Sequence, residues 1–364
     1  MDKSSILNLK LFNICVICAF FLGTVTFTNI ASAQEKAADG TEKKFEPKET
    51  ILEHISDSHS WPVLGNTTLP LPVILYTDKG LETFSSHQLS PEEGVSTIYH
   101  GTNYNYKLDG ETVKVVDASG NVDEAATKKV MDFSITRNVA CMFMAIAILL
   151  IVFLRVSASY KKRVGKAPKG LQSFMEPLIL FVRDDIAQPN IGVKYARFMP
   201  LLLTIFFFIL LNNLLGMVPF FPGGYNLTGN IAVTAVLSVI IFFVVNLNGN
   251  KHYWKHIFVP NPWWLFFIMI PVEIVGIFTK PIALMIRLFA NITAGHILIL
   301  SLISLIFIFK TVWVSPVSIV FVVFMDAIEL LVAFLQAYIF TLLGALFIGM
   351  AIADHHEEHT EEVI

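Results

Sequence analysis

Six charged side chains interrupt an otherwise almost continuous apolar stretch between residues 263 and 353, and they are the first candidates for chemistry. They are Glu273, Lys280, Arg287, Lys310, Asp326 and Glu329. An ionisable group in hydrocarbon costs at least about 2.5–3.5 kcal/mol on insertion scales, so its presence indicates a function. Arg287 is the sharpest case, because a guanidinium keeps its proton and acts as a fixed positive charge, not as a base. It could attract a carboxylate and repel other cations, or it could pair with an internal acid and only hold helices together.

Helical spacing predicts which of these residues share a face. At 100° per residue, Glu273, Lys280, Arg287 and Asn291 fall within about 40° of one another, whereas His296 lies about 180° from Arg287. A helix that carries all five would therefore present a polar face around Arg287 and would place His296 on the opposite side.

A second polar face is predicted farther along the chain. Glu329 and Gln336 are nearly aligned on a helix, and Asp326 is one turn before Glu329 on the same side. Histidine titrates near neutral pH, and carboxylates are suitable partners for proton exchange with it. If a hairpin brings His296 to Glu329 and Asp326, the three could pass protons; the alternative is a static hydrogen-bonded cluster.

Helices that cross a membrane are needed to position these side chains. Hydrophobic residues make up 54% and charged residues 15% of the 364 residues, whereas soluble domains have roughly 25% charged residues. A span needs about 20 apolar residues, and the sequence predicts spans at 138–154, 198–217 and 231–247. Two very long, tilted helical segments follow, separated near 310–316, and Pro271 and Pro281 are candidate kinks. The predicted fold is an all-α polytopic membrane protein with about five spanning helices that ends in a long helical hairpin.

The first 33 residues have the pattern of an export signal. Lys3 and Lys10 flank the start of a short apolar run, which ends in the small residues Ala31-Ser32-Ala33. This pattern is typical of a signal peptide, here cleaved before Gln34. The alternative is a first membrane helix that is retained.

Residues 34–132 are polar and predict a small β-rich extracytoplasmic domain. Turn dipeptides such as Asp109-Gly110 separate runs with strand character at 71–76, 104–108 and 112–116. His54, Asp57 and His59 could ligate a metal, but no further ligand spacing supports a site, and surface polar residues are the favoured interpretation.

Loop charge predicts the orientation of the spans. Between Arg155 and Arg197, nine basic residues stand against three acidic ones, so the positive-inside rule makes this loop cytoplasmic. Within it, 171–186 is amphipathic and is expected to lie along the membrane surface. Residues 218–229 then form an outside loop and 251–256 an inside loop. The expected plan is a signal peptide, an extracytoplasmic extension, a membrane domain and a solvated cytoplasmic tail, at 1–33, 34–132, 133–353 and 354–364.

Several classes of protein are disfavoured. Cys15 and Cys18 lie in the apolar run of the signal, which leaves only Cys141 and no internal disulfide. There is no Gly-x4-Gly-Lys-Ser/Thr motif for a nucleotide, and the net charge of −3 does not suggest nucleic-acid binding. No cofactor and no metal are expected.

The membrane part, from about residue 132 to 353, resembles subunit a of the F-type rotary ATP synthase. The strongest match runs from Lys280-Pro281 through Arg287 to His296, and a second match joins Glu329 to the segment Gln336-Ala-Tyr-Ile-Phe. Weaker matches lie at 211–219 and 230–234. The extension at 34–131 has no counterpart in the short N-terminus typical of that family.

The resemblance implies roles for the central polar residues. Arg287 falls on the family's essential arginine, which faces the carboxylate of the rotating c-ring. Asn291 and Gln336 fall on polar positions near it, and Glu273 falls on the acid associated with the inner half-channel.

The outer half-channel is implied by a second set of matches. His296 and Glu329 fall on its histidine/acid pair, in the order found in mitochondrial members and opposite to the enterobacterial order. Asp326 is counted with this proton path, and Gly216 is assigned no role.

The function implied is that of the proton-translocating stator subunit, which delivers protons to and from the c-ring through two offset half-channels. Its partners would be the c-ring, the b subunits of the peripheral stalk and membrane lipid, in a bacterial inner membrane. The alternative is a self-contained proton-coupled secondary transporter, which would usually show internal repeats. A mere membrane anchor would need no buried arginine.

Overall fold

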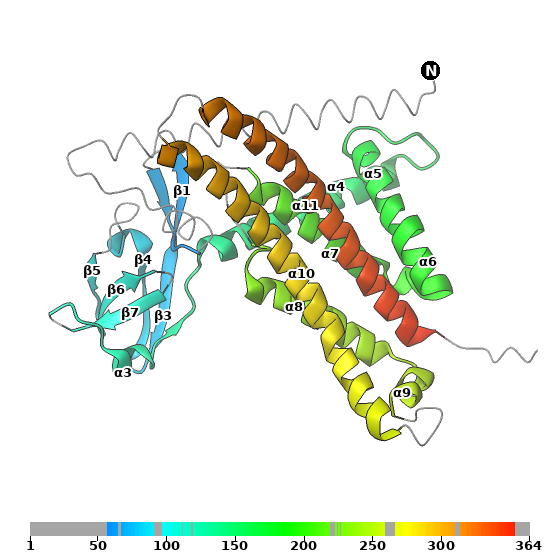
Figure 1. The fold of residues 1–364 in the computed structure, drawn as a ribbon, viewed down its shortest axis with the longest axis horizontal. Coiled ribbons are helices and arrows are strands. Elements are labelled where there is room, and N and C mark those ends of the chain that lie inside the picture. Colours follow the sequence, from blue (N-terminus) through cyan, green and yellow to red (C-terminus); the bar gives the residue numbers. More distant parts are fainter. Residues whose placement is uncertain are drawn as a thin grey trace, which may run out of the picture. The chain divides into compact units, whose positions relative to one another are not determined.

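The computed structural model contains a β-rich N-terminal region and a set of long apolar helices (Figure 1). The predicted signal peptide with its cleavage site at Gln34, His54, the connection at 310–313 and the tail at 354–364 lie outside the described residues. Those residues are 57–64, 67–90, 97–110, 112–117, 119–218, 223, 225, 227–258, 266–309 and 314–353.

Antiparallel strands form the N-terminal region, as predicted. The three sheets have the strand orders β1-β2, β4-β3-β8 and β5-β6-β7. The strands are β1 (Ser60–Leu64), β2 (Thr67–Pro70), β3 (Pro72–Thr77), β4 (Gly80–Ser85), β5 (Ile98–His100), β6 (Asn105–Asp109), β7 (Thr112–Val116) and β8 (Met131–Asp132), with a short η1 (Ser86–Gln88) and α3 (Glu124–Thr127).

Alternating side chains and tight turns explain these strands. Val73 and Leu75 on β3 are fully buried and pack with Tyr106, Val113 and other apolar residues into one small core. The predicted turn at Asp109-Gly110 joins β6 to β7, and Gly110 has the positive φ of 61° that favours glycine at this point.

Ten helical segments follow in the described part of the chain. They are α4 (Arg137–Lys162), α5 (Leu171–Phe181), the π-helical η2 (Val182–Ala187), α6 (Gln188–Ile191), η3 (Gly192–Lys194), α7 (Tyr195–Gly216), α8 (Ile231–Asn248), α9 (Lys251–Phe258), α10 (Phe266–Phe309) and α11 (Val314–Ile352).

Five helical stretches among the described residues are long and apolar enough to span a membrane. They confirm the predicted polytopic fold, with the two long helices at the C-terminal end. They are Arg137–Lys162, Leu171–Gly216, Ile231–Asn248, Phe266–Ser304 and Val320–Ile352.

Local details differ from the sequence expectations. The predicted inside loop at 251–256 is the helix α9. As predicted, in contrast, Pro271 and Pro281 lie inside one long helix, α10. Pro316 is not in a turn, because α11 already begins at Val314; proline fits a first helical turn, where its missing N–H has no intrahelical partner.

The described residues fall into two compact units, and each long helix contributes to both. The first unit contains Met1–Ile146, Asn212–Leu227 and Thr293–Leu331. The second contains Ala147–Leu211, Thr228–Ile292 and Val332–Ile364. The C-terminal half of α10 and the N-terminal half of α11 therefore belong to the first unit, and their other halves to the second.

A continuous apolar core holds the second unit together. Buried residues of α7, α8, α10 and α11, such as Phe206, Ile241, Leu288 and Phe340, pack in one cluster. The amphipathic segment predicted at 171–186 is helical and contributes Met175, Val182 and Ile186 to the same cluster. Its apolar side is therefore a protein contact in this unit.

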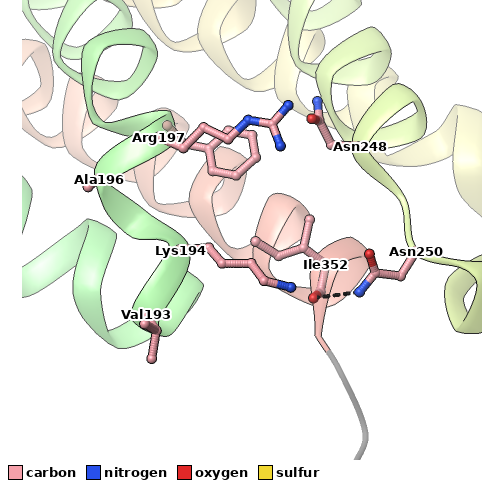
Figure 2. Close-up of a pocket in the computed structure, with 8 residues that line it drawn as sticks. Val193, Lys194, Ala196, Arg197, Asn248, Asn250 and Ile352 are labelled. Carbon is pink, nitrogen blue, oxygen red and sulfur yellow. Dashed lines mark hydrogen bonds between the residues drawn. The ribbon is translucent and has the colours of Figure 1, made fainter.

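A half-open pocket of about 300 Å³ lies where α7, α8 and α11 end or begin in the second unit (Figure 2). The backbone N–H of Asn250 donates to the carbonyl of Ala351 (2.8 Å), and its side-chain Nδ2 donates to that of Ile352 (2.9 Å). The last carbonyls of a helix have no partner within it. Asn250, which lines this pocket, therefore caps α11.

Candidate functional site

The first unit brings His296 of α10 to Glu329 of α11. His296 Nδ1 lies 3.5 Å from Glu329 Oε1, and the glutamate side chain is only 8% exposed. Glu329 Oε1 has no hydrogen-bond partner in the described part of the chain. The two groups are thus adjacent but not locked, which suits a pair whose contact tightens when a proton moves between them.

Two further residues shape this pair. Asp326 lies one turn before Glu329, is buried, and has an Oδ2 atom without a hydrogen-bond partner among the described residues. A Cβ atom at Gly295 would lie 3.2 Å from Glu329 Oε1. The glycine therefore leaves the space that the carboxylate occupies, next to His296 in the sequence.

Three residues near this pair received no role from sequence reasoning. A Cβ atom at Gly216 would lie 2.8 Å from the carbonyl oxygen of Tyr225 and 4.0 Å from His296 Nε2. The Tyr225 hydroxyl donates to Asn212 Oδ1 (3.4 Å), and both residues are buried. Burial raises the pKa of Tyr225, which therefore stays protonated. The amide of Asn212 within an apolar helix is a sequence signal from which a buried polar contact at this position could have been predicted.

Arg287 lies in the second unit, on the N-terminal half of α10. Gln336 of α11 is buried, and its Nε2 donates to the backbone carbonyl of Arg287 (2.8 Å). The Arg287 side chain is exposed, and no ion pair to its guanidinium occurs among the residues that the structure describes. The backbone is therefore held by α11, whereas the charge is available to a group outside the described chain.

The other polar residues of α10 have separate surroundings. Asn291 is exposed, and Lys280 Nζ lies 5.4 Å from the centre of the Phe347 ring, within cation–π range. Glu273 is half-buried. Burial and the Glu273 carboxylate both raise the pKa of Tyr253 on α9. The Glu273 carboxylate thus influences a helix that sequence reasoning described as a loop.

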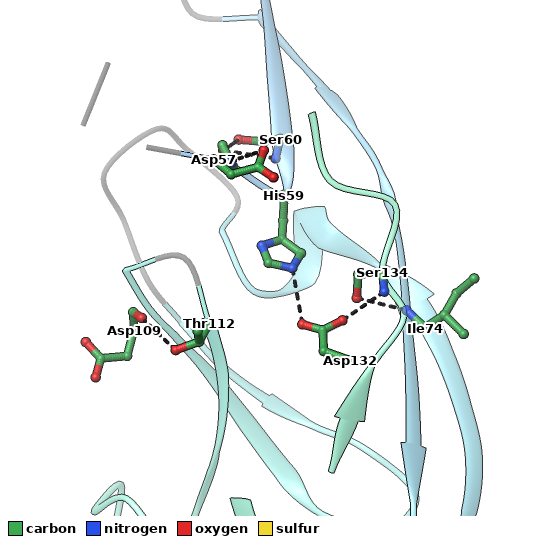
Figure 3. A network of polar contacts seen from close by, with 9 residues as sticks. Asp57, His59, Ser60, Ile74, Asp109, Thr112, Asp132 and Ser134 are labelled. Atoms are coloured by element: carbon green, nitrogen blue, oxygen red, sulfur yellow. Dashed lines mark hydrogen bonds and ion pairs between the residues drawn. The ribbon is translucent and has the colours of Figure 1, made fainter. Parts of the chain in front are cut away.

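The prediction that His59 is a surface residue is wrong. His59 is only 3% exposed, and its Nε2 lies 3.6 Å from Asp132 Oδ2 (Figure 3). The pairing of β8 with β3 brings Asp132 from the far end of the region to His59. No group of three or more possible metal ligands occurs among the described residues, which include Asp57 and His59.

The same network joins the β-rich region to the first long helix. The backbone N–H of Asn138 donates to Asp57 Oδ1 (3.1 Å), and the backbone N–H of Arg137 donates to the carbonyl of Ser58 (2.7 Å). These N–H groups belong to the first turn of α4, where no intrahelical acceptor exists. The segment before β1 therefore caps α4.

Comparison with known families divides the chain in two. Residues 139–349 match the model described as ATP synthase A chain. Residues 50–133 match a separate model, described as a domain of unknown function (DUF8433). The N-terminal region is thus a recurring module that has its own family.

Curated relatives match the chain at high identity, and three are representative. ATP synthase subunit a of Chloroherpeton thalassium is 52% identical over 237 residues, which cover 64% of this chain and 70% of the relative. ATP synthase subunit a 2 of Prosthecochloris aestuarii is 51% identical, with 64% and 72% covered. ATP synthase subunit a of an Anaeromyxobacter species is 44% identical, with 68% and 63% covered. The chain therefore belongs to the ATP synthase A chain family, as its sequence motifs predicted, and is a multi-pass membrane protein of proton transport and ATP synthesis.

Proposed function

We propose that this chain is the stator subunit that delivers protons to and from the c-ring of an F-type ATP synthase, through two half-channels that do not meet. Family membership supports the proton-translocating role. The observation that carries the proposal is the close approach of two titratable groups, His296 and Glu329, in the interior of the first unit. A structural pair in hydrocarbon would be expected to satisfy its hydrogen bonds, and this one leaves Glu329 Oε1 without one.

In the proposed outer half-channel, Glu329, His296 and Asp326 pass a proton to a carboxylate of the c-ring. The neutral carboxyl group then rotates through lipid, which a charged one does only at a high free-energy cost. The driving force is about 2.3 kcal/mol per charge for each 100 mV of membrane potential.

Arg287 separates the two half-channels in this proposal. Its permanent charge favours loss of the proton from the arriving carboxylate and repels protons that would cross directly. Gln336 positions the backbone of Arg287 through its hydrogen bond, Asn291 lies one turn farther along the helix, and Glu273 accepts the proton on its way to the inner side.

We further propose that the β-rich region is periplasmic after signal cleavage and that the C-terminal tail is cytoplasmic, in a bacterial inner membrane. The charge excess between Arg155 and Arg197 and the pattern of residues 1–33 support this orientation. The c-ring and the b subunits are the proposed partners. N-terminal sequencing of the membrane-extracted protein should begin near Gln34, and recovery of peptides from residues 1–10 in the assembled protein would contradict cleavage.

A double-mutant cycle tests the outer pathway. His296→Ala, Glu329→Gln and the double variant are assembled into the complex in membrane vesicles, and ATP-driven proton pumping is measured. Because the groups touch, we expect their effects to be non-additive. Ser301→Ala is the matched control on α10, since its exposed hydroxyl donates within the helix, to Ile297 O. Additive losses, or normal pumping in both single variants, would reduce the pair to a structural one.

A further inference from the structure

The outer face of the sheet β4-β3-β8 carries a row of exposed apolar side chains. In the strand register Tyr76 of β3 lies opposite Leu81 of β4 and opposite Met131 of β8. The three are 54%, 65% and 62% exposed, and Phe133, just after β8, is 63% exposed. These four residues, Leu81, Tyr76, Met131 and Phe133, are called the outer apolar face below.

This face is apolar although the opposite face already forms a core. Val73 and Leu75 point to the buried side, and the acidic residues of the same strands also belong there, since Glu82 is buried and Asp132 contacts His59. The next outward-facing pair along β3 and β4, beside Tyr76 and Leu81, is Ile74 and the uncharged Thr83. An antiparallel sheet with one solvated face normally alternates apolar and polar residues. Here both faces are apolar, and the described part of the chain leaves the outer one open.

The position of this face along the chain indicates what covers it. Backbone hydrogen bonds continue past β8, from Phe133 N to Ile74 O (2.9 Å) and from Ile135 N to Pro72 O (3.1 Å). Two residues later Arg137 begins α4, and its N–H is held by Ser58 O. The sheet is therefore tied to the start of a helix that is long and apolar enough to span a membrane.

The apolar surface of that helix begins close to the sheet. Phe143 is the first large exposed apolar side chain of α4, and at 1.5 Å per residue it lies about 9 Å along the axis from Arg137. The interfacial layer of a bilayer is roughly 5–7 Å thick on each side. The start of α4 therefore lies about 2–4 Å beyond the outer edge of the headgroup layer, so the sheet tied to it borders the membrane surface.

We propose that the outer apolar face binds the membrane surface, with its side chains in the interfacial layer of the bilayer around α4. Tyrosine and phenylalanine are suited to this layer, because an aromatic ring can lie among the acyl chains while a hydroxyl such as that of Tyr76 stays in water. This contact does not depend on the proton pathway, and it gives the N-terminal module a fixed tilt on the bilayer.

Spin-label accessibility of the assembled complex in phosphatidylcholine–phosphatidylglycerol vesicles tests the proposal. Labels are attached to Tyr76→Cys, Met131→Cys and Thr83→Cys; the last lies on the same face but removes no apolar side chain, and the native Cys141 is buried. Thr112→Cys is the matched control on β7, an exposed strand position in the other three-stranded sheet. We expect the ratio of collisions with oxygen to collisions with a water-soluble nickel complex to be several-fold higher at 76, 83 and 131 than at 112.

Two results would overturn the proposal. Equal accessibility to the nickel complex at all four positions would show a solvated face. Immobilised labels that neither reagent reaches would show that a protein subunit covers the face instead. As a further check, Met131→Glu should lower the oxygen-to-nickel ratio at 83 toward that of 112, because a carboxylate resists entry into the interfacial layer, and it should leave proton pumping unchanged.

Discussion

Two buried glutamates, one in the β-rich region and one in the helices, have opposite surroundings. Glu82 accepts hydrogen bonds from the backbone N–H groups of Thr102 (2.5 Å) and Asn103 (3.3 Å) and from the hydroxyl of Tyr106 (2.8 Å). Glu329 has one oxygen without a hydrogen bond and a histidine nitrogen 3.5 Å away. The same residue type is therefore satisfied by hydrogen bonds in one region and left partly unsatisfied in the other.

The difference teaches how to recognise function in a buried charge. A carboxylate whose acceptors are all used stabilises the fold and cannot release its contacts without loss. A carboxylate left partly unsatisfied adds little stability and demands another explanation. Arg287 is a different case, because its backbone is held by Gln336 while its side chain is exposed. Variants of the unsatisfied groups should thus affect transport, and variants of Glu82 should affect stability.

Arg287→Ala should have the largest effect, a complete loss of coupled ATP synthesis with a normal level of assembled complex. Passive proton permeability should rise, because the electrostatic barrier is removed. Arg287→Lys should also fail, since a lysine in this setting can lose its proton and lacks the planar fork. The measurement is ATP synthesis and proton permeability in the same vesicles. Arg183→Ala, which removes an exposed arginine paired with Asp184, is the control, and near-normal synthesis in Arg287→Ala would reject the proposed role.

Glu329→Gln should slow proton delivery on the order of 10²-fold, the lower range for removal of a positioned acid–base group. The amide keeps the shape but cannot relay a proton at neutral pH. Because one oxygen of Glu329 lacks a hydrogen bond, thermal stability of the complex should not fall. If the variant pumps normally, or loses pumping only because the complex unfolds, then Glu329 does not differ from Glu82 in the way we propose.

Glu82→Ala should leave pumping intact and destabilise the β-rich region by about 1–3 kcal/mol, since three donors lose their acceptor in a buried place. Faster hydrogen exchange of the β3 and β4 amides in the assembled protein is the expected signature. Glu124→Ala, at an exposed position of α3, should show little change. Unaltered exchange in Glu82→Ala would mean that its hydrogen bonds contribute nothing net.

The smallest expected effect is a pH dependence at Asp132. Burial raises the pKa of this carboxyl group, but the nearby His59 and the hydrogen bonds from Ser134 lower it more, and the net pKa lies below the ordinary 3.8. A carboxyl group whose pKa is lower in the folded state stabilises the fold at every pH above its unfolded-state pKa. This stabilisation is lost as the pH falls through the folded-state pKa. The β-rich region should therefore weaken below about pH 4. In acid unfolding experiments, Asp132→Asn should make the stability of the β-rich region less dependent on pH. If the pH dependence of stability is unchanged in this variant, other groups cause it.

Much of the fold could be predicted because the patterns are local. The apolar runs predicted the spanning helices, and the turn dipeptides with alternating runs predicted β3, β6 and β7. The helix α9 was missed, because 251–256 is too polar to read as a span and too short to show a clear helical period. The continuation of α10 through Pro271 and Pro281 agrees with the predicted long helical segment.

The candidate site was only partly accessible from the sequence. The proposed roles of Arg287, His296, Glu329, Asn291 and Gln336 came from motifs and helical phase. The approach of Gly216 to both Tyr225 and His296 joins segments that no spacing rule connects. The burial of His59 likewise depends on Asp132, which is far away in the chain.

By itself, the sequence determined that this is a membrane protein of long helices with a β-rich N-terminal module, because apolar length and alternation act over a few residues at a time. It also determined the chemical identity of the groups that can carry charge. Only the tertiary structure decided which buried carboxylate is satisfied and which is not, and which sheet face is left open. Those properties depend on contacts between distant residues, so two glutamates, at positions 82 and 329, differ in how far the groups around them satisfy their hydrogen bonds.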